Sequence, residues 1–242
     1  MTRRWVCLDV GETLIDETRV WSVWADELGI PRLTFMAALG ATIARAAEHG
    51  SVFGIFGYTD ADWRARAPRV EERYGGFRAD DLYPDALAAV DAIKAAGYGV
   101  AVIGNQPAQR TAELTALGVA PEIVAMSDEL GVAKPDPAFF ARSLELLGSP
   151  PPGNVAYVGD RVDNDVLPAA AAGWRAVWIR RGPWGMIHDP PPDGVATLVV
   201  RSLDELVERL DELWPTAPAA AAAATPRATP DAAPGSPPPR GR

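Results

Sequence analysis

Short runs of hydrophobic residues without polar alternation recur along the chain and predict the strands of one sheet. Runs of this kind, rich in Val, Ile and Ala, are typical of parallel strands that are buried on both faces. We expect the strands at residues 5–9, 100–104, 123–126, 155–158, 176–179 and 197–200. Helical patterns lie between most of them, and this alternation favours an α/β fold with helices on both faces of the sheet.

Start and stop signals mark several of the helices. Pro84 precedes a segment with apolar residues at helical spacing, and Gly97 follows that segment. Asp136, which a proline follows directly, begins a second helix, and residues 203–213 form the last one.

Residues 16–82 carry no strand signal, so we expect this segment to be entirely helical. Pro68 should kink or shorten the third of its helices, because proline lacks the amide proton of a helix interior. The three helices are predicted at 18–28, 32–48 and 59–73.

Two features of the helical segment bear on its role. Trp21 and Trp24 lie on one helical stripe, which we interpret as the segment's own core, since aromatic side chains are mostly buried. The glycine-rich residues 50–57 are predicted to form a loop that faces a substrate.

The chain therefore divides into three parts. Residues 1–15 and 83–214 form the α/β core, and residues 16–82 form the helical insert. Residues 215–242 are almost wholly Ala, Pro, Thr, Gly and Arg, and they show no apolar periodicity. Such a segment cannot bury enough apolar surface to offset the entropy of ordering, so we predict a disordered tail.

Composition excludes several classes of protein. The 242 residues are 48% hydrophobic, and no apolar run approaches the roughly 20 residues that span a bilayer. The net charge of −9 argues against nucleic acid or an anionic membrane as a partner. The one cysteine, Cys7, excludes an internal disulfide and is interpreted as a small core residue. We expect a soluble cytoplasmic protein.

Polar residues stand where the predicted strands end. Asp9 follows the first strand, Asn105 follows the second, and Asp160 and Asp165 follow the fourth. Because parallel strands present their carboxyl ends at one edge of the sheet, we expect these side chains to share a site there. Two strands that each deliver a carboxylate could supply the oxygen ligands that Mg²⁺ prefers.

Lysine is almost absent from the chain. The 23 basic residues include only two lysines, Lys94 and Lys134. Lys94 lies in an alanine-rich helix and is interpreted as a solvated charge. Lys134 precedes a helix within Ala-Lys-Pro-Asp-Pro, and its compact ammonium can meet a phosphoryl oxygen and a carboxylate together.

These motifs, in this order, resemble those of the haloacid dehalogenase-like (HAD) hydrolase superfamily, and the match runs from Asp9 to about Gly185. The resemblance implies a Rossmann-like three-layer sandwich with a central parallel sheet. It also implies that the helical insert is a small all-helical cap domain, which would close over the site, exclude water and select the substrate.

The resemblance also implies the chemistry. Asp9 would attack a phosphoryl group and form an aspartyl-phosphate that water then hydrolyses. Lys134 would neutralise developing charge, and Asn105 would donate a hydrogen bond to a phosphoryl oxygen. The implied cofactor is Mg²⁺, and its ligands would be Asp9, the backbone carbonyl of Gly11, Asp160 and Asp165.

Two positions depart from the pattern of the family's phosphatases. Gly11 stands where they carry a second Asp as general acid/base, and Gly104 stands where they carry Ser or Thr. Glu12 would either take over the acid/base role or lie at the hinge of the cap. Dehalogenases of the superfamily also lack the second Asp but work without a metal. Phosphonatases need a cap lysine, and residues 16–82 contain none.

We therefore predict a Mg²⁺-dependent phosphatase that acts on a small phosphorylated metabolite, as a monomer or homodimer without nucleic-acid or membrane partners. The alternative is a degenerate HAD-fold protein that binds a phosphorylated ligand or partner without efficient turnover. No motif surrounds His49 or His188, and neither is assigned a role.

Overall fold

The structure is a computed structural model, and it describes residues 2–215. The tail predicted at 215–242 lies outside the described residues except for Pro215. A six-stranded sheet of order β3-β2-β1-β4-β5-β6 forms the centre, and every neighbouring pair is parallel. Its strands are β1 (Trp5–Leu8), β2 (Gly99–Gly104), β3 (Ile123–Met126), β4 (Val155–Gly159), β5 (Arg175–Ile179) and β6 (Ala196–Val200).

Alternate residues of each strand face two separate cores, which explains the unbroken apolar runs. One core joins the sheet to α5 (Ala86–Ala95), α6 (Arg110–Ala116), α11 (Leu203–Glu208) and α12 (Leu210–Leu213). The other joins the sheet to α8 (Pro137–Leu146) and α9 (Leu167–Ala171). These two layers and the sheet confirm the predicted Rossmann-like sandwich. The shorter elements are α7 (Ser127–Leu130), α10 (Gly182–Ile187), η1 (Ala79–Asp81), η2 (Pro152–Asn154) and η3 (Val162–Val166).

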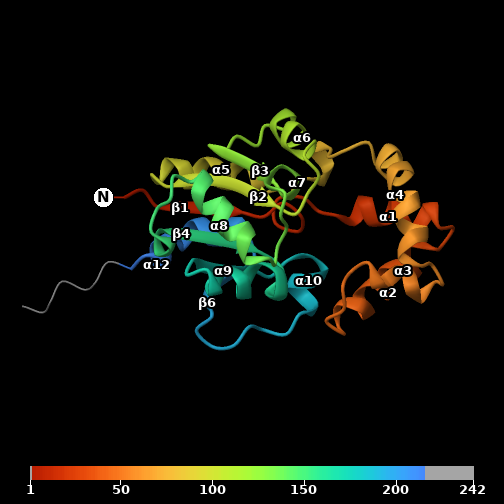
Figure 1. Ribbon diagram of the computed structural model, residues 1–242. Helices are drawn as coiled ribbons and strands as arrows, with labels where there is room; N and C mark the ends of the chain where they lie inside the picture. Colours follow the sequence, from red (N-terminus) through yellow and green to blue (C-terminus); the bar gives the residue numbers. More distant parts are fainter. Residues whose placement is uncertain (1, 216–242) are drawn as a thin grey trace, which may run out of the picture.

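Four helices form the cap, which confirms the predicted small helical unit. Figure 1 shows them in red to orange, gathered beyond one end of the sheet. Their apolar faces meet in one cluster that includes Trp21, Trp24 and Phe35. The helices are α1 (Thr18–Glu27), α2 (Arg32–Ile43), α3 (Ser51–Ile55) and α4 (Asp60–Tyr74).

Core residues also hold the cap in place. Trp184 of α10 packs into the apolar cluster of the cap. Arg110 of α6 is buried, and its guanidinium donates to Glu71 of α4 at 2.7 Å and to Glu113 of its own helix at 2.8 Å. The cap is therefore fixed to the core by both apolar packing and a buried cation.

Four sequence predictions need correction, three within the cap and one at the last helix. The second cap helix ends at Ile43 instead of residue 48, and Ala46 then takes a positive φ of 51° that turns the chain. Part of the predicted loop at 50–57 is helix α3. Pro68 does not shorten α4, whose ends are fixed by a capping box at Thr59 and a left-handed Gly75. The last helix is interrupted at Arg209, which separates α11 from α12.

Among the helices of residues 2–215, none is both long enough and apolar enough to span a membrane.

Candidate active site

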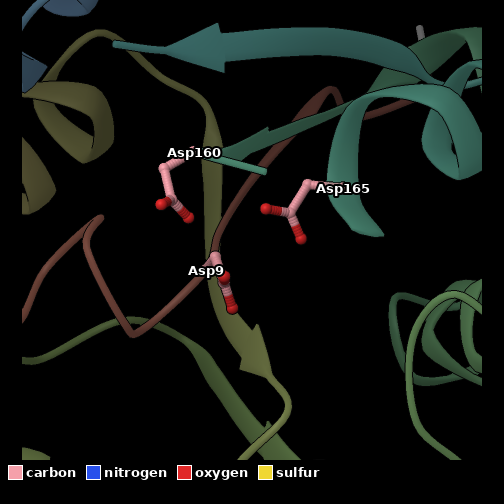
Figure 2. A group of neighbouring side chains, drawn as sticks. All are labelled: Asp9, Asp160 and Asp165. Atoms are coloured by element: carbon pink, nitrogen blue, oxygen red, sulfur yellow. The ribbon is translucent and has the colours of Figure 1, made fainter. Parts of the chain in front are cut away.

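Three carboxylates converge at the carboxyl edge of the sheet. β1 and β4 are neighbours with Leu8 paired to Val158, so Asp9 and Asp160 emerge side by side. The π-helical turn η3 returns Asp165 to the same place. One oxygen from each of these three side chains lies within 4.8 Å of the other two, and Figure 2 shows the three side chains around a common space. This is the convergence expected from the strand ends.

Hydrogen bonds hold the backbone of Asp9 and Asp160 and the carboxylate of Asp165. The Asp9 amide donates to Val158 O at 2.9 Å, and the carbonyl of Asp160 accepts from the indole of Trp178 at 2.9 Å. Asp165 Oδ2 accepts from the Arg161 amide at 2.9 Å. All three side chains are buried, so the cluster is poorly hydrated.

Lys134 reaches this cluster as predicted. Its ammonium lies 2.8 Å from Asp9 Oδ1 and 2.6 Å from Asp165 Oδ1, and the residue is only 5% exposed. Burial opposes its charge, but Asp165 and Asp9 outweigh that effect and raise the pKa of Lys134. Burial also raises the pKa of Asp9 to about 6, against the opposing attraction of Lys134.

Asn105 lies beside Lys134 and binds its backbone. Asn105 Nδ2 donates to the Lys134 carbonyl at 2.9 Å, and Asn105 Oδ1 accepts from the Lys134 amide at 2.8 Å. Asn105 also lines the pocket between this cluster and the cap, where its second Nδ2 proton is available to a ligand.

The cluster has more negative than positive charge, and this excess indicates whether a metal ion would fit there. Three buried carboxylates share one ammonium, and Asp160 Oδ2 has no hydrogen-bond partner among the described residues. Burial, followed by repulsion from Asp165 and Asp9, raises the pKa of Asp160 well above its usual range. An oxygen-only donor set with excess negative charge suits a divalent cation such as Mg²⁺.

Glu12 forms its hydrogen bonds with the cap linker and with Tyr83 instead of with the three carboxylates. Its carboxylate accepts from the Tyr83 hydroxyl at 2.5 Å and from the Glu17 amide at 3.1 Å. Burial raises the pKa of Glu12 to about 7. These contacts match those expected for the hinge alternative, and the catalytic role stays a prediction.

A pocket of about 300 Å³ opens between the carboxylate cluster and the cap. The core side includes the predicted residues Asp9, Gly11, Glu12, Asn105, Lys134 and Asp160. The remaining wall comes from residues that the sequence did not single out as ligand contacts: Glu17, Val20, Trp21, Trp24, Glu48, His49, Gln106, Pro135, Arg161, Asn164 and Trp184.

The cap's contribution differs from the one expected. The glycine-rich residues 50–57 do not line the pocket, whereas His49, just before them, does. Trp21 and Trp24 pack in the cap core as expected, and both also face the pocket. His188 lies outside the lining, where its Nδ1 accepts from the Val162 amide at 3.2 Å. The sequence pattern alone does not distinguish His49, which lines the pocket, from His188, which does not.

Comparison with known proteins agrees with this geometry. A family model described as haloacid dehalogenase-like hydrolase matches residues 4–173. The chain is similar to a phosphoserine phosphatase from Thermus thermophilus, with 38% identity over 128 residues. That alignment covers 52% of this chain and 49% of the relative, so it spans about half of the relative's length.

Two solved structures show how widely the fold is shared. The HAD-hydrolase YfnB from Bacillus subtilis, solved with bound magnesium, has a TM-score of 0.66 at 17% identity. An L-2-haloacid dehalogenase has a TM-score of 0.63 at 17% identity. Each superposition covers 87% of this chain and 100% of the other. The fold alone therefore does not distinguish phosphatase from dehalogenase chemistry.

Proposed function

Because the chain belongs to the haloacid dehalogenase-like hydrolase family, we propose that it is a Mg²⁺-dependent phosphatase for a small phosphorylated metabolite. One observation favours a phosphatase over a dehalogenase, namely the excess negative charge at the carboxylate cluster. Three buried carboxylates share one ammonium, and Asp160 Oδ2 has no hydrogen-bond partner in residues 2–215, which favours the binding of a further cation.

The proposed Mg²⁺ ligands are the side chains of Asp9, Asp160 and Asp165 with the backbone carbonyl of Gly11. When bound, the ion supplies charge neutralisation that lets an anionic phosphate approach the carboxylates. The other roles belong to the chain's own residues.

Asp9 is the proposed nucleophile. Its carboxylate is held at the end of β1, with one oxygen on Lys134, so its direction of attack is fixed before substrate binds. Attack on phosphorus forms an aspartyl-phosphate and expels the alcohol, and water then releases inorganic phosphate. Lys134 and Asn105 stabilise the charge that builds on the phosphoryl oxygens.

The pocket supports a small substrate. A volume of about 300 Å³ lies at the lower end of the range for small-molecule sites. Aromatic side chains of the cap face the polar cluster, so the proposed substrate places its phosphate on the core and its organic part against the cap. A cytoplasmic monomer or homodimer remains part of this proposal.

A second candidate is a protein that binds a phosphorylated ligand without efficient turnover. Two positions favour it, Gly11 in place of the family's second Asp and Gly104 in place of its Ser or Thr. A Cβ atom on Gly104 would lie 2.6 Å from Asp9 Oδ1, so a Ser or Thr does not fit beside Asp9 as placed here, and the hydroxyl that the family's phosphatases carry at this position is missing.

Hydrolysis of 4-nitrophenyl phosphate separates these possibilities. We expect turnover with Mg²⁺, none in EDTA, and none for Asp9→Asn with Mg²⁺. Release of chloride from L-2-chloropropionate in EDTA would instead identify a dehalogenase. Phosphate binding without turnover across a panel of small phosphate esters would favour the second candidate and overturn the first.

A further inference from the structure

Glu17 occupies the space that a side chain at position 11 would fill. A Cβ atom built on Gly11 would lie 2.4 Å from Glu17 Oε1 and 2.8 Å from Glu17 Cδ. Both distances are shorter than real Cβ contacts, so the two side chains exclude each other. Gly11 does not have the left-handed φ that would itself require glycine. The glycine is explained by the Glu17 carboxylate above it.

The Glu17 carboxylate faces the pocket and is not used to cap a helix. Glu17 precedes α1 as its N-cap residue, yet its side chain accepts no capping hydrogen bond. The carboxylate lines the pocket with Asp9 and accepts from Gln106 Nε2 at 3.3 Å. A carboxylate in this position can exchange a proton with a group bound at Asp9.

The backbone of Glu17 is held firmly. Its amide donates to Glu12 Oε1 at 3.1 Å, and Glu12 Oε2 accepts from the Tyr83 hydroxyl at 2.5 Å. Its carbonyl accepts from the Trp21 amide at 3.2 Å in the first turn of α1. Glu12 thus holds the backbone of Glu17 in place.

We propose that Glu17 is the general acid/base of the hydrolysis, in place of the carboxylate that position 11 lacks. This proposal rests on the proposed phosphatase function. The acid/base is then carried by the cap linker, while the nucleophile Asp9 is carried by the sheet.

Glu17 gives up one proton and regains one in each turnover. As Asp9 attacks phosphorus, the bond from phosphorus to the leaving oxygen breaks, and protonated Glu17 gives its proton to that oxygen to release the alcohol. Water then attacks the phosphorus of the aspartyl-phosphate and gives a proton to the Glu17 carboxylate. The bond from Asp9 to phosphorus breaks, phosphate leaves, and Glu17 is again protonated.

Glu17→Gln tests the acid role by leaving-group dependence. Loss of a general acid costs about 10²–10⁴ in rate when the leaving group needs a proton. We expect a loss of this size on an alkyl phosphate such as glycerol phosphate. With 2,4-dinitrophenyl phosphate, whose leaving group needs no proton, rapid mixing should show a burst of about one equivalent of dinitrophenolate followed by slow turnover.

The burst arises because the second step still lacks its base. Asp26→Asn on α1 is the matched control, since Asp26 is bonded to Arg32 at the surface, and it should behave as wild type on both esters. Equal rate losses on both esters without a burst, or no loss on the alkyl ester, would overturn the role of Glu17. If wild type itself hydrolyses no phosphate ester, the proposed function fails instead.

An exchange of the two positions gives an independent test. Gly11→Asp alone should lose activity, because its side chain would meet the Glu17 carboxylate. Gly11→Asp combined with Glu17→Ala removes that collision and should recover activity to within about tenfold of wild type, whereas Glu17→Ala alone should not. A double variant that is folded by circular dichroism, yet no more active than Glu17→Ala, would contradict the proposal.

Discussion

The excess charge at the carboxylate cluster predicts that Asp160→Asn stabilises the metal-free protein. Two ionised carboxylates 4.8 Å apart repel by roughly 3.5 kcal/mol at an effective dielectric constant of about 20. Asp160 has two such neighbours, Asp9 and Asp165, and Lys134 offsets about one of them. Removing the Asp160 charge should therefore raise the free energy of unfolding in EDTA by about 2–4 kcal/mol.

Protonation of Asp160 in the wild-type protein limits the stabilisation expected for Asp160→Asn and makes it depend on pH. The pKa of Asp160 is raised in the folded protein, so the unfolded chain loses this proton first and stability falls as pH rises above the unfolded value. At pH 7.5 the Asp160 carboxyl cannot lower the free energy of unfolding by more than about 5 kcal/mol. This limit follows because pH 7.5 lies roughly 3.6 units above the pKa of an unfolded Asp, and each pKa unit corresponds to about 1.4 kcal/mol. The advantage of Asp160→Asn should shrink as pH falls toward about 4.

Thermal unfolding with and without Mg²⁺ measures both consequences. In EDTA at pH 7.5, Asp160→Asn should unfold about 10 °C above wild type. Saturating Mg²⁺ should stabilise wild type by about 3 kcal/mol at 100 times its dissociation constant and the variant far less. Asp163→Asn is the control, because Asp163 is half-exposed and paired with Arg161, and it should shift both midpoints little. An unchanged or lower midpoint for Asp160→Asn in EDTA would refute the charge argument.

Three further substitutions test contacts that fix the site. Lys134→Met should cost about 3–5 kcal/mol by urea unfolding in EDTA, because two buried carboxylates lose their shared cation, and a loss under about 1 kcal/mol would contradict this. Arg110→Ala should cost about 2 kcal/mol, since its partners are only partly buried, and should make the cap more sensitive to limited proteolysis; unchanged proteolysis would show that packing alone holds the cap. Tyr83→Phe should cost about 1–3 kcal/mol in urea, because buried Glu12 loses its hydroxyl donor, and an unchanged midpoint would mean that water replaces it.

The sheet could be predicted closely because its strands are buried on both faces. Each observed strand begins and ends within one residue of its predicted bounds, since helices with clear stop signals separate the apolar runs. Strand order could not be predicted in the same way, because it depends on crossovers. The family resemblance implied a Rossmann-like sandwich with a parallel sheet, but it did not include the order of the strands.

The cap was predicted less well because its apolar residues serve two surfaces. Trp21 and Trp24 face both the cap core and the pocket, so helical spacing alone identifies only the first role. The second cap helix was extended too far because residues 44–48 have good helix propensity, whereas the chain turns at Ala46 to place α3. Helix propensity does not predict a turn that tertiary packing imposes.

The carboxylates of the cluster and Glu17 differ in how their positions are determined. Asp9 and Asp160 follow strands directly, so the parallel sheet alone brings them together. Glu17 reaches the site only because the chain reverses after Gly11, where Glu12 adopts a φ of 50° and Ile15 pairs with Gly11. That reversal returns a residue six positions later to the space above Gly11. A candidate to replace a missing motif group can therefore come from a residue that occupies the same volume in the fold, whereas Glu12, the next residue in the chain, bonds to the Glu17 amide and to Tyr83.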